Sequence, residues 1–164
     1  MGHNATITDS LIVPECIYRP GTFTGLMTLY ESNYVKLLQL IEGFQTFVEK
    51  APEITISQTD LDCDLQLEIK LKEKYTTTLN ITYLLYLDDD VGVNAAVLDP
   101  DLTIRVYHDA KLIEVLHGLE EHRHQKLCEF HKTHSCELDT RWKNNMMLNK
   151  WLDYLLEVGH GFSI

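Results

Sequence analysis

Hydrophobic residues change their spacing several times along the chain, and the first regular pattern is helical. Residues 1–25 contain prolines and glycines but no sustained hydrophobic period, so we expect an N-terminal arm that lies against the rest of the domain. From Leu26 to Val48, apolar side chains recur three and four residues apart, which predicts one helix with a face directed at the core. Ala51-Pro52 ends this helix, because the residue before a proline disfavours helical backbone.

Alternation of apolar and polar residues follows the helix and is typical of strands with one buried face. The predicted strands cover residues 54–57, 65–72, 75–85, 102–107 and 111–116. The breaks between successive strands are mostly short, which favours antiparallel neighbours, since parallel strands need a crossover of roughly a dozen residues or more. The pattern therefore predicts one antiparallel sheet of about five strands.

The remaining segments differ in polarity. Residues 117–138 are polar and rich in histidine and glutamate, and we expect them to form a long excursion from the domain. Beyond them, apolar residues crowd one side of a closing helix, with Asp139 placed to cap its start and Gly159 placed to adopt a left-handed conformation after its end. The order of helix, strands and helix predicts an α+β fold, with a single antiparallel sheet and an N-terminal and a C-terminal helix packed on one face.

Length and charge narrow the classes of function. A chain of 164 residues has the size of one domain, so we expect a single domain over residues 1–164. The 14 Lys and Arg against 25 Asp and Glu give a net charge of -11, and without a basic stripe we expect no nucleic-acid partner. No apolar run is long enough to span a bilayer and no signal-peptide pattern is present, so we expect a cytoplasmic protein without a membrane partner. The four scattered cysteines are expected to remain reduced thiols.

The densest polar cluster lies on the last two predicted strands. If Asp109-Ala110 forms the turn between them, the two-residue period determines which side chains face each other. The facing pairs are Val106 with Ile113 and Ile104 with Val115 on the buried side, and Tyr107 with Leu112 and Arg105 with Glu114 on the outer side. One interpretation is structural, with Arg105 and Glu114 forming a cross-strand ion pair worth about 0.2 to 1 kcal/mol.

Two other interpretations of the same cluster are functional. In the leading hypothesis Arg105 anchors an anionic group of a small ligand or protein partner, because its guanidinium offers forked donors. Tyr107 then supplies a flat contact with a hydroxyl group, and Glu114 completes the binding set. The alternative is a hydrolase-type enzyme in which His108, oriented by Asp109, is the general base and Arg105 stabilises developing negative charge. This alternative requires His108 to open into a pocket with a carboxylate within hydrogen-bond reach.

Two further groups of residues could bind metals. Cys128, His131, His134 and Cys136 are separated by two, two and one residues and could hold zinc, although structural zinc sites usually combine two distant ligand pairs. The other interpretation is a solvated excursion with histidines along its surface. The acidic stretch that begins at Asp88 does not fit a calcium loop, because its glycine falls one position too early. The sequence has no glycine-rich phosphate loop, and we expect no cofactor.

Three segments carry a resemblance to a known family. They are Leu29, Glu31, Asn33, Tyr34, Leu37 and Leu40 in the first helix, residues 103–110 with Glu114-Val115, and Asn145, Met147, Leu148, Trp151, Leu152, Tyr154 and Gly159 in the closing helix. Together with Tyr75-Thr76-Thr77, they make the chain similar to the YqiB-like family of uncharacterised proteobacterial proteins, domain of unknown function 1249, between residues 26 and 160. The resemblance implies no reaction, substrate or cofactor.

These observations favour a small cytoplasmic domain that binds a ligand or a partner without catalysis, through Arg105, Tyr107 and Glu114. The alternatives are the hydrolase-type enzyme with His108 and Asp109, and a zinc-stabilised module on residues 117–136. The leading hypothesis depends on Arg105 and Tyr107 pointing away from the helices.

Overall fold

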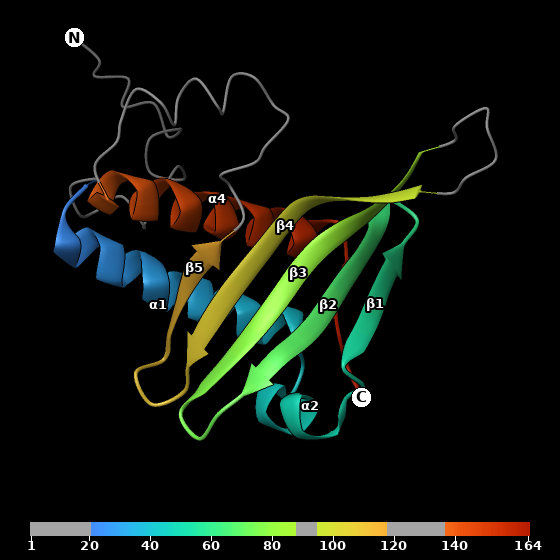
Figure 1. Ribbon diagram of the computed structural model, residues 1–164, viewed down its shortest axis with the longest axis horizontal. Helices are drawn as coiled ribbons and strands as arrows, with labels where there is room; N and C mark the ends of the chain where they lie inside the picture. The colour runs from blue at the N-terminus through green and yellow to red at the C-terminus, as the bar shows by residue number, and fades with distance from the viewer. Residues whose placement is uncertain (1–20, 88–94, 118–136) are drawn as a thin grey trace, which may run out of the picture.

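The computed structural model describes residues 21–87, 95–117 and 137–164 and contains one antiparallel sheet of five strands in the order β1-β2-β3-β4-β5. Each strand pairs with its neighbours along the chain, so the sheet is a simple meander (Figure 1). The elements are α1 (Phe23–Leu40), α2 (Phe44–Lys50), β1 (Ile54–Thr59), β2 (Asp62–Lys72), β3 (Thr76–Leu87), β4 (Ala95–Tyr107), β5 (Leu112–His117) and α4 (Glu137–Glu157).

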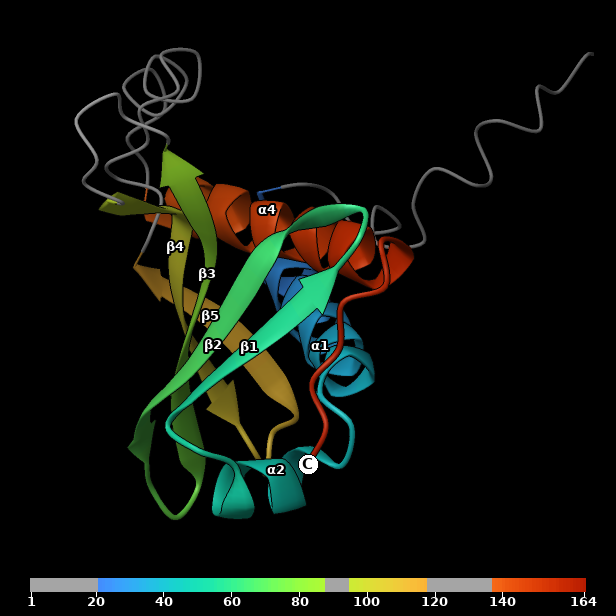
Figure 2. The same cartoon turned by 90° about the vertical axis from the view of Figure 1, so that its right-hand side faces the viewer.

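Helices cover only one face of this sheet. Figures 1 and 2 show α1 and α4 side by side behind the strands, while α2 lies at one end of the sheet. The opposite face, turned toward the viewer in Figure 1, is not covered by any described helix. The predicted α+β fold, with one antiparallel sheet and an N-terminal and a C-terminal helix on one face, is confirmed.

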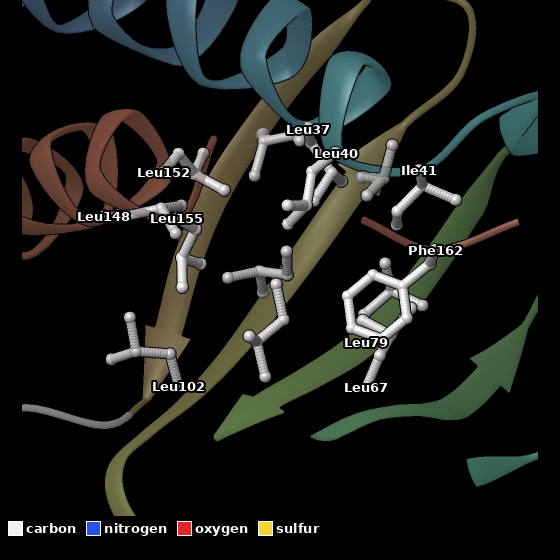
Figure 3. Close-up of a cluster of buried hydrophobic side chains, with 14 of the residues drawn as sticks. Leu37, Leu40, Ile41, Leu67, Leu79, Leu102, Leu148, Leu152, Leu155 and Phe162 are labelled. Carbon is white, nitrogen blue, oxygen red and sulfur yellow. The ribbon is translucent and has the colours of Figure 1, made fainter. Parts of the chain in front are cut away.

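The core fills the space between the covered face and the two long helices. Figure 3 shows side chains from α1, α4, the strands and the chain end converging there. The labelled residues are Leu37, Leu40, Ile41, Leu67, Leu79, Leu102, Leu148, Leu152, Leu155 and Phe162, all buried. Since burying one such side chain contributes about 1.5 to 3 kcal/mol, this layer is the main source of the stability of the fold.

The first helical segment is interrupted where the sequence pattern predicts continuity. The prediction of one helix from Leu26 to Val48 is wrong, because α1 ends at Leu40 and α2 begins at Phe44. Gly43 between them has a positive φ of 61°, a conformation that glycine adopts without steric cost. The C-terminal tail occupies the break: Phe162 N donates to Leu40 O at 2.8 Å, and Glu42 N donates to Phe162 O at 2.9 Å. These bonds satisfy backbone groups that a continuous helix would have satisfied itself.

The closing helix differs from its prediction at the start and agrees with it at the end. It begins at Glu137, so Asp139 lies in its first turn rather than at its cap. Gly159 has a φ of 89°, and the bonds from Gly159 N to Leu156 O at 3.3 Å and from His160 N to Leu155 O at 2.9 Å form a helix terminus of the Schellman type. The predicted left-handed glycine is confirmed.

A buried amide network joins α1, α4 and β5. Asn149 Nδ2 donates to Asn33 Oδ1 at 2.9 Å, and Asn33 Nδ2 donates to Asn145 O at 3.2 Å. Asn145 Oδ1 accepts from Val115 N at 3.0 Å, and Asn149 Oδ1 accepts from Lys36 Nζ at 2.7 Å. All three asparagines are fully buried. Because each of their side-chain oxygens and nitrogens has a partner, the network avoids the cost of buried polar groups without hydrogen bonds.

Candidate functional site

The candidate site lies on β4 and β5, at the edge of the open face, where side chains of α1 and α4 reach Leu112 and Glu114. All four predicted facing pairs are observed: Arg105 with Glu114, Tyr107 with Leu112, Val106 with Ile113 and Ile104 with Val115. Ile104, Val106, Ile113 and Val115 are buried in the main core. Since side chains alternate between the two faces of a strand, Arg105 and Tyr107 project on the opposite, open face.

Glu114 does not use Arg105 as its partner. Tyr107 Oη donates to Glu114 Oε1 at 2.5 Å, and Arg141 Nη1 from α4 donates to Glu114 Oε2 at 3.3 Å. Within the described ranges, no ion pair shorter than 4.0 Å joins Arg105 to any carboxylate. The strand register predicted for a cross-strand ion pair is therefore present, but the ion pair itself is replaced by bonds from Glu114 to Tyr107 and Arg141.

The guanidinium of Arg105 is partly buried and incompletely satisfied. Its Nε atom is buried and has no hydrogen-bond partner. Burial is the first cause that raises the pKa of Tyr107, followed by its hydrogen bond to Glu114, while nearby Arg105 acts in the opposite direction. Arg105 is therefore a cation hydrogen-bonded to a neutral phenol, with an Nε donor that no described acceptor uses.

The rest of the open face is mixed: Ile54, Ile56 and Leu71 are exposed apolar residues on it, and several of its polar groups have partners. Asn80 on β3 donates to Asp101 on β4 at 2.6 Å, and Lys70 on β2 forms an ion pair with Glu68 at 2.7 Å. The small side chain of Thr78 faces Arg105 across the strands. Arg105 differs from these groups because, among the described residues, it has no ion pair and lies beside a small hydroxyl residue.

His108 and Asp109 do not form the predicted dyad in this geometry. His108 Nε2 lies 3.0 Å from Thr77 Oγ1, and His108 Nδ1 lies 3.3 Å from Gln45 Nε2 of α2. The His108 ring is also 6.0 Å from the ring of Phe44. Asp109 is exposed in the turn. Since both ring nitrogens of His108 have other partners, His108 packs between β3 and α2, and the geometry gives the general-base hypothesis no support.

The predicted zinc ligands Cys128, His131, His134 and Cys136 lie outside the described residues, as does the stretch that begins at Asp88. Over the described part of the chain, no group of three or more His, Cys, Asp and Glu residues is arranged to hold a metal ion.

Cys63 is an exposed free thiol. No helix built from the described residues has the length and apolar character needed to cross a membrane.

A second polar cluster, buried and not predicted, joins the chain end to the sheet. Ser57 Oγ lies 3.0 Å from His160 Nδ1 and accepts a hydrogen bond from Gly161 N at 3.1 Å. Tyr83 Oη donates to Asp62 Oδ2 at 2.6 Å. His160 Nε2 is 3.4 Å from the same Asp62 oxygen but makes no hydrogen bond. Burial, followed by the bond to Asp62, raises the pKa of Tyr83 well above its ordinary value.

This serine, histidine and aspartate set serves to fasten the C-terminal tail. Ser57 and His160 are both buried, and the Ser57 oxygen is already bonded to the backbone of Gly161. A catalytic serine needs an oxygen that a substrate can reach, which this arrangement does not offer. No local signal could have revealed the cluster, because Ser57 and His160 are separated by 103 positions and share no motif.

Comparison with known proteins identifies the family of the chain. The sequence model of the family described as Protein of unknown function (DUF1249) matches residues 36–161, a range that contains both polar clusters. The resemblance found in the sequence to this domain of unknown function is confirmed. No curated protein and no solved structure matches the chain significantly.

Proposed function

The chain belongs to the DUF1249 family of proteins of unknown function, and we propose that it is a non-catalytic cytoplasmic domain that binds a small anionic ligand, or an anionic group of a partner protein, on the open face of its sheet. Arg105 is the anchor, and Tyr107 lines the site. The observation that carries this proposal is the guanidinium of Arg105, which has no ion pair within the described ranges although Glu114 stands opposite it.

The chemistry of Arg105 suits this role. A guanidinium presents several donors in a planar fork that matches a carboxylate or a phosphate, and it keeps its charge at every physiological pH. The Nε atom is buried without a partner, so an anion would reach this donor only when the side chain turns toward solvent. Because an unmade bond to a buried polar atom is costly, a ligand oxygen bound after that turn would recover part of the cost.

The charge of the whole chain limits the size of the anion. At a net charge of -11, long-range repulsion opposes the approach of a polyanion. A ligand with one or two acidic groups, held at short range by Arg105, fits better.

A thermal-shift screen of the full chain against carboxylates, phosphates and mononucleotides tests the proposal. A ligand at a hundred times its dissociation constant adds about 2.7 kcal/mol of stability, which gives a clear rise in melting temperature. We expect Arg105→Gln to abolish the rise. The matched control is Lys70→Gln, which removes a cation of the same sheet face that already has a partner in Glu68, and it should keep the rise. Equal responses from both variants, or none from the wild type, would refute the proposal.

A further inference from the structure

We propose that Tyr107 and Arg141 are positioning residues that hold the Glu114 carboxylate away from Arg105 and so keep the guanidinium available to an anion. This inference rests on the proposed function of Arg105. It assigns to Tyr107 a role beyond contact with the ligand, and it connects the site to α4 through Arg141.

The two oxygens of Glu114 are held separately. One accepts from the phenol of Tyr107 at 2.5 Å, and the other accepts from Arg141 at 3.3 Å. The Glu114 side chain is only 14% exposed, so water competes weakly for these oxygens. A hydroxyl bond to a carboxylate at this distance belongs to the strong class of hydrogen bonds. Tyr30 of α1 also shares a hydrogen bond with Glu114, and Tyr107 is the restraint that lies on the same strand as Arg105.

Without that restraint, Arg105 is the natural partner of Glu114. The two residues face each other on neighbouring strands, where facing side chains start about 5 Å apart and opposite charges attract. Glutamate has enough rotatable bonds to turn its carboxylate from Tyr107 to the guanidinium. Once there, the carboxylate would occupy the donors that an incoming anion needs and would compete with it.

The contact between Tyr107 and Glu114 also has a simpler interpretation, in which it only stiffens the end of the β4–β5 hairpin. The two interpretations differ in what the removal of the phenol oxygen does to Arg105. A stiffening contact affects stability alone. A restraint on Glu114 creates a new coupling between Arg105 and Glu114, and this coupling disappears when Glu114 loses its charge.

Binding is tested with inorganic phosphate and with succinate, titrated into the full chain and followed by the NMR shifts of the backbone amides of β4. We expect Tyr107→Phe to weaken binding of the responding probe roughly fivefold, the size expected for competition by one half-buried ion pair. The double variant Tyr107→Phe with Glu114→Gln should restore the wild-type affinity, because its amide no longer competes. Unchanged affinity in Tyr107→Phe, beside wild-type binding that requires Arg105, would overturn this inference and leave the proposed function standing.

A second measurement needs no ligand. The melting-temperature shifts of Arg105→Gln and Glu114→Gln should add in the wild-type background, because the two groups do not pair there. In the Tyr107→Phe background the shifts should become non-additive, because the new ion pair couples the two sites. If neither phosphate nor succinate binds the wild type at Arg105, the proposed function is refuted. Additivity in both backgrounds would overturn the restraint by Tyr107 as well.

Discussion

Two polar groups of this molecule, the amide network between α1 and α4 and the guanidinium of Arg105, differ in how completely they are satisfied. Asn33, Asn145 and Asn149 are fully buried and use every side-chain oxygen and nitrogen in a hydrogen bond. Arg105 stands on the open face with a buried Nε that lacks a partner. Satisfied buried groups stabilise the fold, whereas an unsatisfied cation beside solvent is available to a ligand.

Both groups lie in segments that carry the family resemblance, so position in the sequence does not separate a structural residue from a binding residue. The separation comes from the hydrogen bonds. Asn145 connects α4 to the backbone of β5 through Val115, while Arg105 leaves its facing residue Glu114 to Tyr107 and Arg141. Substitutions should therefore affect stability at the first position and binding at the second.

The largest loss of stability is expected for Asn145→Ala. The variant leaves the buried Val115 N without its acceptor and removes the donor to Arg141 O. A buried donor without a partner, together with the small cavity, should lower the free energy of unfolding by about 2 to 4 kcal/mol. Urea denaturation followed by circular dichroism measures this loss.

The matched control for Asn145 is its neighbour Asn144. Asn144 is buried to a similar degree, 8% exposed, but its Oδ1 has no hydrogen-bond partner. Asn144→Ala should cost less than half as much as Asn145→Ala. Equal losses would mean that the burial of an amide, and not its hydrogen bonds, decides the cost, and the contrast with Arg105 would lose its basis.

The next largest effect is expected where the C-terminal tail is fastened. Ser57→Ala removes the acceptor of Gly161 N and the partner of His160 Nδ1, which should cost about 1 to 2 kcal/mol of unfolding free energy. Amide hydrogen exchange at Gly161 and Phe162 should accelerate with it. Thr55→Val on the same strand is the control, because Thr55 Oγ1 is buried without a partner. If Thr55→Val lowers the free energy of unfolding as much as Ser57→Ala does, the conclusion that Ser57 fastens the C-terminal tail is wrong.

Alkaline pH should lower the stability of the fold through Tyr83, by less than the two substitutions above. Its pKa is raised first by burial and then by its bond to Asp62, so the folded state holds the phenol proton more tightly than the unfolded chain does. This contribution is present below the ordinary tyrosine pKa of about 10 and is lost as the pH rises past it. Stability should therefore fall above that pH, and Tyr83→Phe should fall less steeply.

Denaturation curves at stepwise pH values measure this difference in slope. Tyr75→Phe is the control, since Tyr75 is exposed and its removal leaves the buried phenols in place. If Tyr83→Phe keeps the wild-type slope while Tyr75→Phe changes it, the bond between Tyr83 and Asp62 does not govern the alkaline loss.

The local pattern of the sequence was sufficient to predict the fold class and part of the candidate site. The β4–β5 register follows from the two-residue period and one turn, and every predicted facing pair is present. The break at Gly43 could not be predicted in this way, because it depends on Phe162 entering from the far end of the chain. For the same reason, the replacement of Arg105 by Arg141 as the partner of Glu114 is visible only in three dimensions.

The smallest change in stability is expected at Arg105 itself. Arg105→Met keeps most of the aliphatic stem, and it removes both the charge and the buried Nε that has no partner. Since no ion pair within the described ranges is lost, and the lost hydrogen bond is to the partly exposed Tyr107, the free energy of unfolding should change by less than about 1 kcal/mol. A loss comparable to that of Asn145→Ala in the same urea titration would show that Arg105 belongs with the structural polar groups. A melting curve that hardly moves, beside an abolished ligand response, is the combination that only a binding residue produces.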